Sequence, residues 1–186
     1  MDMFTPLVKT SRRSLLGLLA FPLLLAGCST TTVNGVTTVT LNMARINLWV
    51  TAVTKASQAL LADNIFASLI GATVSAAMST AAGKLASLMS ALNALANGAA
   101  TLTFNASSPP AAFSSLMSDL QEISGYVTGV LNTAGPTKIG PQIVNYIQAI
   151  QTLVALFVAL TSLVAAPKLP MTENQALIIC GVKPLN

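Results

Sequence analysis

The chain has 186 residues, of which 53% are apolar and 8% are charged, whereas about 25% of the residues in soluble domains are charged. The net charge is +4, but only six basic and four acidic residues lie beyond Cys28, which excludes a basic surface for nucleic acid. The chain contains no histidine, the commonest general base and metal ligand. Its length and apolar content indicate one folded domain rather than a disordered chain.

The first 27 residues have the order of an export signal. A polar start carries Lys9, Arg12 and Arg13, and residues 15–26 are almost wholly apolar. This run of about 12 residues is too short to cross a hydrocarbon layer of about 30 Å as a helix. We therefore predict a signal peptide over 1–27.

The signal ends in Leu25-Ala26-Gly27-Cys28, which resembles the lipobox of bacterial lipoprotein precursors. In that family the cysteine sulfur is joined to a diacylglycerol, the signal is cut just before the cysteine, and the freed amine is acylated, with palmitate among the chains. The resemblance implies that Leu25, Ala26 and Gly27 form the cleavage site and that Cys28 is the lipid-bearing first residue. The alternatives are an uncleaved signal anchor and a secretory signal in which Cys28 carries no lipid.

Two further resemblances concern export and sorting. Ser29 follows the cysteine, where the inner-membrane retention signal of enterobacterial lipoproteins has Asp, and this favours the periplasmic face of the outer membrane. The segment 11–16, Ser-Arg-Arg-Ser-Leu-Leu, resembles the twin-arginine motif, in which Arg12 and Arg13 are the recognised pair. The sequence leaves general secretion open as the other route.

A threonine-rich, uncharged segment follows, Ser29–Thr40. Its Asn34-Gly35 pair is a strong hairpin signal, but an isolated two-stranded hairpin is marginal in water. We predict a lipidated, flexible tether over 28–40, with a hairpin as the alternative if a partner completes the sheet.

From Leu41 the apolar spacing becomes helical. We predict an all-α, alanine-rich bundle of four main helices and a short C-terminal helix over 41–186. The signals for helix ends are Ala62 with Asp63 or Asn64, Asn97-Gly98, Ser108 with Pro109 and Pro110, Gly135-Pro136, Gly140-Pro141, Ala166, and the capping-box pair Thr172 and Gln175 before a helix over 175–180. Asp63 or Asn64 either caps a new helix or merely interrupts one long helix.

Periodic side chains predict which faces are buried. The first helix has one apolar face, made of Trp49, Val53, Ala56 and Leu60. The second has a heptad seam of Leu85, Leu88, Leu92 and Leu95. It also has small residues every four positions, which predict close approach of a neighbouring helix: Gly71, Ser75, Ser79 and Gly83, then Ala82, Ala86, Ser90 and Ala94. The third has an apolar stripe of Phe113, Leu116, Met117, Leu120, Ile123, Val127, Val130 and Leu131.

The fourth helix raises the question of a membrane span. Residues 143–166 carry no charge and are long enough to cross a bilayer. A polar and small stripe interrupts them, formed by Asn145, Gln148, Thr152, Ala155, Ala159 and Ser162. The opposite face is apolar and consists of Ile143, Ile147, Ile150, Val154, Phe157 and Leu160. This division favours a half-buried bundle helix, with membrane insertion as the alternative.

The chemistry-bearing residues are few. Asp119 and Glu122 lie on one helical face, which we interpret as a solvated face because no histidine completes a site. The sequence has neither a phosphate loop nor a nucleophile elbow. We expect no enzymatic activity, no metal site and no cofactor. Cys180 is either a buried core residue or, if Cys28 carries lipid, a thiol that pairs with another chain.

These observations predict a lipid-anchored envelope protein with a structural or partner-binding role. Its partners are the membrane, through the lipid on Cys28, and a protein partner or second copy through helix faces, with no nucleic acid. One alternative is a helical oligomer that inserts in membranes, as a pore or lysis factor does. Another is a carrier of an apolar ligand, with a cavity lined by residues such as Phe113, Met117, Phe157 and Leu160.

Overall fold

The structure, a computed structural model, describes residues 28–161 and 168–185. The signal over 1–27 and the predicted end of the fourth helix at Ala166 lie outside the described residues. The elements run in the order β1 (Ser29–Val33), β2 (Val36–Asn42), α1 (Met43–Ala62), α2 (Asn64–Ala96), β3 (Thr101–Asn105), α3 (Ala111–Ala134), α4 (Pro136–Thr161) and α5 (Glu173–Ile179). Four long helices and a short C-terminal helix confirm the predicted helical bundle, to which a small sheet is added.

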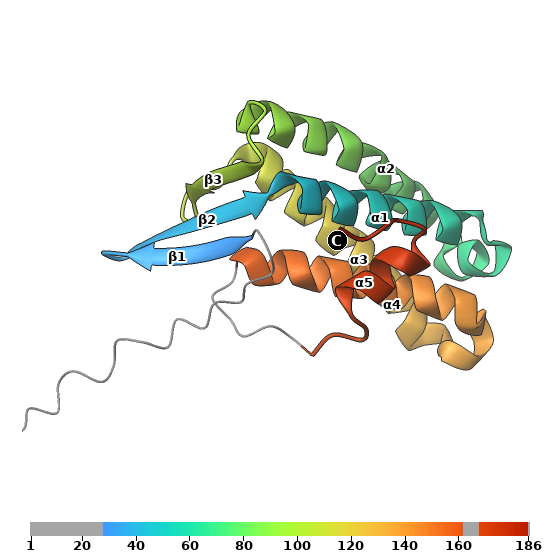
Figure 1. Ribbon diagram of the computed structural model, residues 1–186. Helices are drawn as coiled ribbons and strands as arrows, with labels where there is room; N and C mark the ends of the chain where they lie inside the picture. Colours follow the sequence, from blue (N-terminus) through green and yellow to red (C-terminus); the bar gives the residue numbers. More distant parts are fainter. Residues whose placement is uncertain (1–27, 162–167, 186) are drawn as a thin grey trace, which may run out of the picture.

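The four long helices form a ring in which each packs against the next. Helix α1 contacts α2 and α4, and α3 contacts the same two helices from the other side. Helices α2 and α4 therefore lie on opposite sides of the bundle, with little contact between them (Figure 1). Helix α5 also packs on α4, so α4 is covered by three helices and α2 by two.

Local capping chemistry explains why α1 and α2 are separate helices. The Asp63 carboxylate accepts hydrogen bonds from the backbone amides of Ile65 and Phe66, at 2.9 and 3.0 Å, and so caps the start of α2. Asn97 ends α2 in a left-handed conformation with φ 49°. Both ends agree with the prediction from sequence.

Helix α3 begins later than the sequence predicts. Pro110 is the N-cap and Ala111 the first helical residue, so neither proline occupies the first turn and Ser108 does not cap the helix. The backbone amides of Phe113 and Ser114 instead bond to the Pro110 carbonyl, because a proline carbonyl remains a full acceptor.

Helix α4 begins earlier than predicted. It starts directly at Pro136, after the C-cap Gly135 of α3. Gly140, with φ 78° and ψ 156°, interrupts the helical backbone, and Pro141 follows this break. The predicted start after Gly140-Pro141 therefore marks a kink inside the element. The capping box of Thr172 and Gln175 forms as predicted and opens α5 two residues before Gln175.

The threonine-rich segment after Cys28 is an ordered hairpin rather than the predicted flexible tether. Strands β1 and β2 pair antiparallel along Ser29–Val33 and Val36–Asn42, and Asn34 and Gly35 have the positive φ of 51° and 78° that a tight turn needs. Strand β3 pairs with the other side of β2 and completes the sheet. Three strands with one face packed on helices are stable where two strands alone are marginal.

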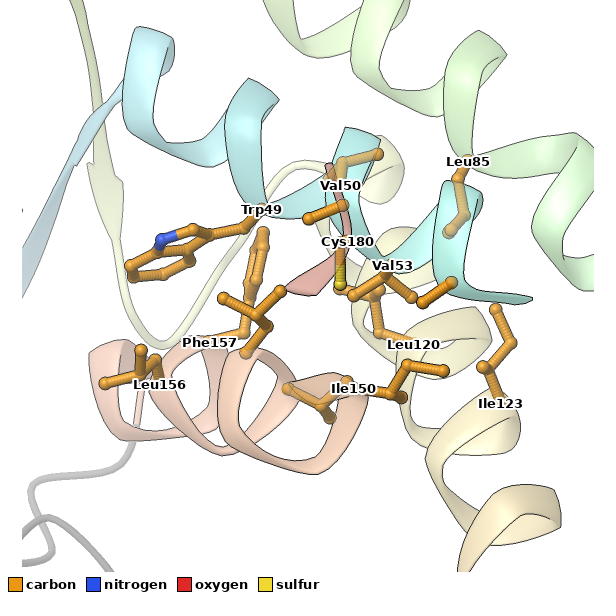
Figure 2. Packing of buried hydrophobic residues seen from close by; sticks show 14 of the residues in the cluster. Trp49, Val50, Val53, Leu85, Leu120, Ile123, Ile150, Leu156, Phe157 and Cys180 are labelled. Carbon is orange, nitrogen blue, oxygen red and sulfur yellow. The ribbon is translucent and has the colours of Figure 1, made fainter. Parts of the chain in front are cut away.

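One core joins the four long helices. Figure 2 shows Trp49 and Val53 of α1, Leu120 of α3 and Phe157 of α4 converging on a common interior. The rings of Trp49 and Phe157 meet edge to face with centroids 5.4 Å apart. The predicted apolar faces of α1 and α4 are buried throughout, which confirms both. Burial of each such side chain stabilises the fold by about 1.5–3 kcal/mol.

Candidate functional site

The expected lipid-attachment residue, Cys28, lies inside the fold. Its side chain is 1% exposed and belongs to the hydrophobic core. The Asn42 backbone amide donates a hydrogen bond of 3.2 Å to the Cys28 sulfur. Burial raises the pKa of the Cys28 thiol above its usual 9.0, while the Asn42 hydrogen bond and the Arg45 charge lower it by less. The described fold thus holds this cysteine as a protonated, inaccessible thiol.

A charged cluster of Arg45, Glu173 and Trp49 lies next to Cys28. The Arg45 Nε donates to Glu173 Oε1 at 2.8 Å, and a second guanidinium nitrogen of Arg45 pairs with Oε2. The indole Nε1 of Trp49 donates to the same Oε1 at 2.8 Å. The two charged side chains are only 14% and 15% exposed. This cluster fastens the start of α5 to α1, and the sequence could not reveal it because 128 residues separate the ion pair.

Strand β1 is tied to the helices close to Cys28. The Thr30 hydroxyl donates to the Leu160 carbonyl near the end of α4, at 2.9 Å. Ser29 already pairs with Thr40 of β2. Strand β1 therefore begins at the first residue after Cys28, with no flexible spacer between this position and the bundle. A lipid on the Cys28 sulfur requires that this one residue leave the core.

The side of α2 that faces away from α1 and α3 is exposed, and we call it the outer face of α2. The helix has 33 residues and a single charge, Lys84. By length and composition α2 and α4 are the two described helices able to cross a membrane, yet 22% of the most apolar stretch of α2 is buried, against 56% for α4. Ile65, Leu69 and Leu95 of α2 are about half exposed.

The small residues of α2 face outward. Ala86, Ser90 and Ala94 are exposed, as are Gly71, Ser79 and Gly83, while Ala82 is buried. The predicted close approach of a neighbouring helix to this stripe does not occur within the described chain. Of the predicted heptad seam, Leu85 and Leu92 are buried, Leu88 is half-buried and Leu95 is exposed.

Four hydroxyl groups on this outer face are hydrogen-bonded within α2. Ser68, Thr80, Ser87 and Ser90 each donate to a carbonyl three or four residues earlier, at 2.8 to 3.1 Å. Burying an unpaired hydroxyl is costly, whereas burying one that keeps its hydrogen bond is not. Burial of these four hydroxyls would therefore carry little polar cost.

Cys180 lies in the core, between α1 and α4 (Figure 2). Its side chain is 5% exposed, and burial raises its pKa from 9.0 to about 12. Cys28 and Cys180 are both free thiols. The burial supports the interpretation of Cys180 as a core residue over that of a thiol that pairs with another chain.

The remaining sequence-predicted candidates do not form a catalytic constellation. Glu122 is exposed and accepts a hydrogen bond of 2.5 Å from the Tyr126 hydroxyl, and Asp119 is half-buried. The residues at 28–161 and 168–185 include no group of three or more potential metal ligands.

A pocket of about 290 Å³ opens between the sheet and α3. Phe113 and Met117 line it together with Val39 and Phe104. The other two residues expected at an apolar cavity, Phe157 and Leu160, are not part of its lining. The Phe157 ring instead packs against Phe113, with centroids 6.4 Å apart.

Comparison with protein-family models, with curated proteins and with solved structures finds no match for this chain.

Proposed function

We propose that this protein is a lipid-anchored component of a bacterial cell envelope, and that it binds a protein partner or a second copy of itself through the outer face of α2. The observation that carries the partner-binding role is the exposure of a helix with one charge in 33 residues. Water is a poor environment for such a surface, and large exposed apolar patches mark interaction sites. Its internally bonded hydroxyls support the same role.

The lipid anchor is supported by the Leu25-Ala26-Gly27-Cys28 motif behind an apolar run. In the proposed arrangement the signal over 1–27 is removed, Cys28 carries the lipid, and the protein lies on the periplasmic face of the outer membrane. Because strand β1 begins at Ser29, the bundle would stand directly at the lipid surface, without a tether.

The buried position of Cys28 also favours one export route. A chain exported by the twin-arginine route crosses the membrane folded, and its Cys28 would then be inaccessible to modification. General secretion delivers an unfolded chain with an accessible cysteine. We therefore propose that the lipid is attached before β1 folds and that Arg12 and Arg13 serve only as the basic start of the signal.

The anchor is tested by feeding cells an alkyne analogue of palmitate and measuring its incorporation into the full-length chain. Incorporation into the native chain and its loss in Cys28→Ser are expected. The pair Arg12→Lys and Arg13→Lys keeps the charge but not the arginines, so incorporation should persist if general secretion is used. Equal incorporation into the native chain and Cys28→Ser would overturn the anchor.

The partner surface is tested with a photo-crosslinking amino acid at single exposed positions of the full chain in living cells. Position 90 lies on the outer face of α2, and position 121, on α3, is an exposed control. A discrete adduct of one size from position 90, absent from position 121, is expected. Identical adduct patterns from both positions would contradict the proposal.

Membrane insertion is the second candidate, because α2 is long and apolar enough to cross a membrane and little of its most apolar stretch is buried. Helix α4 is the weaker candidate, since α1, α3 and α5 all pack on it. Insertion of α2 predicts leakage of dye from liposomes on addition of the protein, whereas a partner-binding bundle leaves liposomes intact.

A role as carrier of an apolar ligand is supported by the pocket beside Phe113 and Met117.

A further inference from the structure

A second hollow lies between the first part of α2 and the second half of α3, and we call it the α2–α3 groove. Its volume is about 390 Å³, within the range of about 300–1,000 Å³ that is usual for small-molecule sites. Leu69, Ile70 and Val74 form the α2 wall. Gly71, between them, has φ 73° and breaks the helical backbone, which changes the direction of this wall.

Two glycines open the α3 wall. Gly125 and Gly129 are four residues apart and both line the groove, together with the buried Val130. A Cβ atom at either glycine would meet nothing within 4 Å, so packing within the described chain does not demand glycine there. Glycine inside a helix nevertheless destabilises that helix relative to alanine. The sequence thus keeps an open, apolar trough at a cost in helix stability.

The groove has one cationic end. Lys138, in the first turn of α4, lines it and is exposed, and it forms no ion pair with the described residues. At the other end the Tyr126 hydroxyl donates a hydrogen bond to the Glu122 carboxylate, so that carboxylate already has a partner. From Gly125 to Ala134 the α3 wall is about 14 Å long, at a rise of about 1.5 Å per residue. A mostly apolar trough of this length, with the Tyr126 and Thr133 hydroxyls in its lining and a single ammonium group at its end, complements an elongated apolar molecule with one anionic head.

We infer that the α2–α3 groove binds a free, single-chain fatty acid, with the hydrocarbon along Gly125 and Gly129 and the carboxylate at Lys138. Contact with the trough provides the affinity, since removing methylene groups from water is favourable. The exposed Lys138 distinguishes the acid from neutral lipids by charge, and its long side chain can reach the head group from the rim. This site is separate from the pocket beside Phe113 and does not depend on a lipid at Cys28.

The test uses a photoreactive diazirine analogue of lauric acid on the full-length chain in its membranes, with mass spectrometry of the labelled peptides. Labelling concentrated on the peptides around 69–74 and 125–134 is expected. Gly129→Leu fills the trough and should reduce this labelling about tenfold. Ser118→Leu introduces the same side chain at an exposed position of α3 outside the groove and should leave labelling unchanged.

A second pair of probes tests the head group. Lys138→Gln should reduce labelling by the acid several-fold and leave labelling by its methyl ester unchanged. Equal labelling by acid and ester in the native chain would overturn the carboxylate recognition. Labelling that spreads over all exposed apolar segments, or that survives Gly129→Leu, would overturn the site itself. Circular dichroism checks that each variant is folded, and Gly125→Leu provides an independent filling substitution.

Discussion

Helices α2 and α4 are almost equally apolar, and each carries a single charged residue, yet they have opposite environments. Helix α4 is covered by α1, α3 and α5, so its apolar side chains are explained by the core of this chain. Helix α2 buries most of its large apolar side chains against α1 and α3 on one side. Its other side presents mainly small residues to solvent, together with Ile65, Leu69 and Leu95. The core of this chain therefore explains the hydropathy of α4 but not that of α2. We propose that α2 is apolar because it contacts a second molecule.

Replacing one leucine of each helix by lysine should give the largest difference in unfolding free energy between α4 and α2. Leu153 of α4 is fully buried, so Leu153→Lys places an unpaired charge in the core and should cost at least about 4 kcal/mol or prevent folding. Leu95 of α2 is 54% exposed, and Leu95→Lys should change the free energy of unfolding by less than about 0.5 kcal/mol. Urea unfolding followed by circular dichroism measures both. Similar losses for the two variants would mean that α2 is as buried as α4.

Alkaline pH should weaken the core around Cys180 while leaving the α2 face unaffected. The pKa of Cys180 is 9.0 in the unfolded reference and about 12 in the fold. Between these values the unfolded chain has lost a proton that the folded chain keeps, so stability falls as pH rises, by up to about 1.4 kcal/mol per pH unit. Below pH 9 the Cys180 thiol keeps its proton in both the folded and the unfolded chain, so none of this stability is lost.

The matched variant for this effect is Cys180→Ala, which removes the thiol. The difference in unfolding free energy between the native chain and Cys180→Ala should shrink as pH rises from 9 towards 12. A difference that stays constant across this range would show that Cys180 titrates normally in the fold.

Two threonines provide a finer comparison. Thr152 of α4 is fully buried, and its hydroxyl has no hydrogen-bond partner among the described residues. Thr152→Val replaces it by a methyl group of the same shape and should stabilise the protein by about 1 kcal/mol or more. Thr80 of α2 is exposed and donates to the Ala76 carbonyl, so Thr80→Val should have an effect near zero. Thermal unfolding of the two variants measures the contrast, and a destabilised Thr152→Val would indicate that the hydroxyl has a partner.

Lysines on the outer face of α2 should have the smallest effect on stability and a large effect on association. Ala86→Lys with Ser90→Lys places two charges on exposed positions, so unfolding should change by less than about 0.5 kcal/mol. Binding should be lost, since a desolvated charge without a partner opposes association. The size of the complex extracted from the envelope is the measurement, with Gln121→Lys on α3 as control. A complex of unchanged size in the α2 variant would contradict the assignment of this face.

The sequence predicts the helices well because their signals are local. Asp63 caps α2, Asn97 ends it, and Thr172 with Gln175 opens α5, each through groups within a few residues of one another. The hairpin could not be predicted in this way, because the strand that completes its sheet, Thr101–Asn105, follows two long helices. The Arg45 and Glu173 pair depends in the same way on distant packing.

Periodicity also shows which side chains share a face but not what covers that face. The small stripe of α2 has the spacing of a packed interface, yet it is exposed. The polar stripe of α4 has the spacing of a wet face, yet Thr152 is fully buried because α4 has neighbours on several sides. Coverage depends on the arrangement of all the helices in the ring. The lipobox, by contrast, predicts an anchor at Cys28 but not the burial of its sulfur.

The accessibility of the α2 face in the envelope is the most direct measurement of the central claim. Single cysteines at positions 86 and 90 of α2, and at 121 of α3 as an exposed control, are labelled with a maleimide in intact envelopes and in the purified protein. Cys180 contributes little background because it is buried and its pKa is about 12. Protection of positions 86 and 90 in the envelope alone, with position 121 labelled equally in both samples, is the predicted result. Equal labelling of all three positions in the envelope and in the purified protein would contradict it.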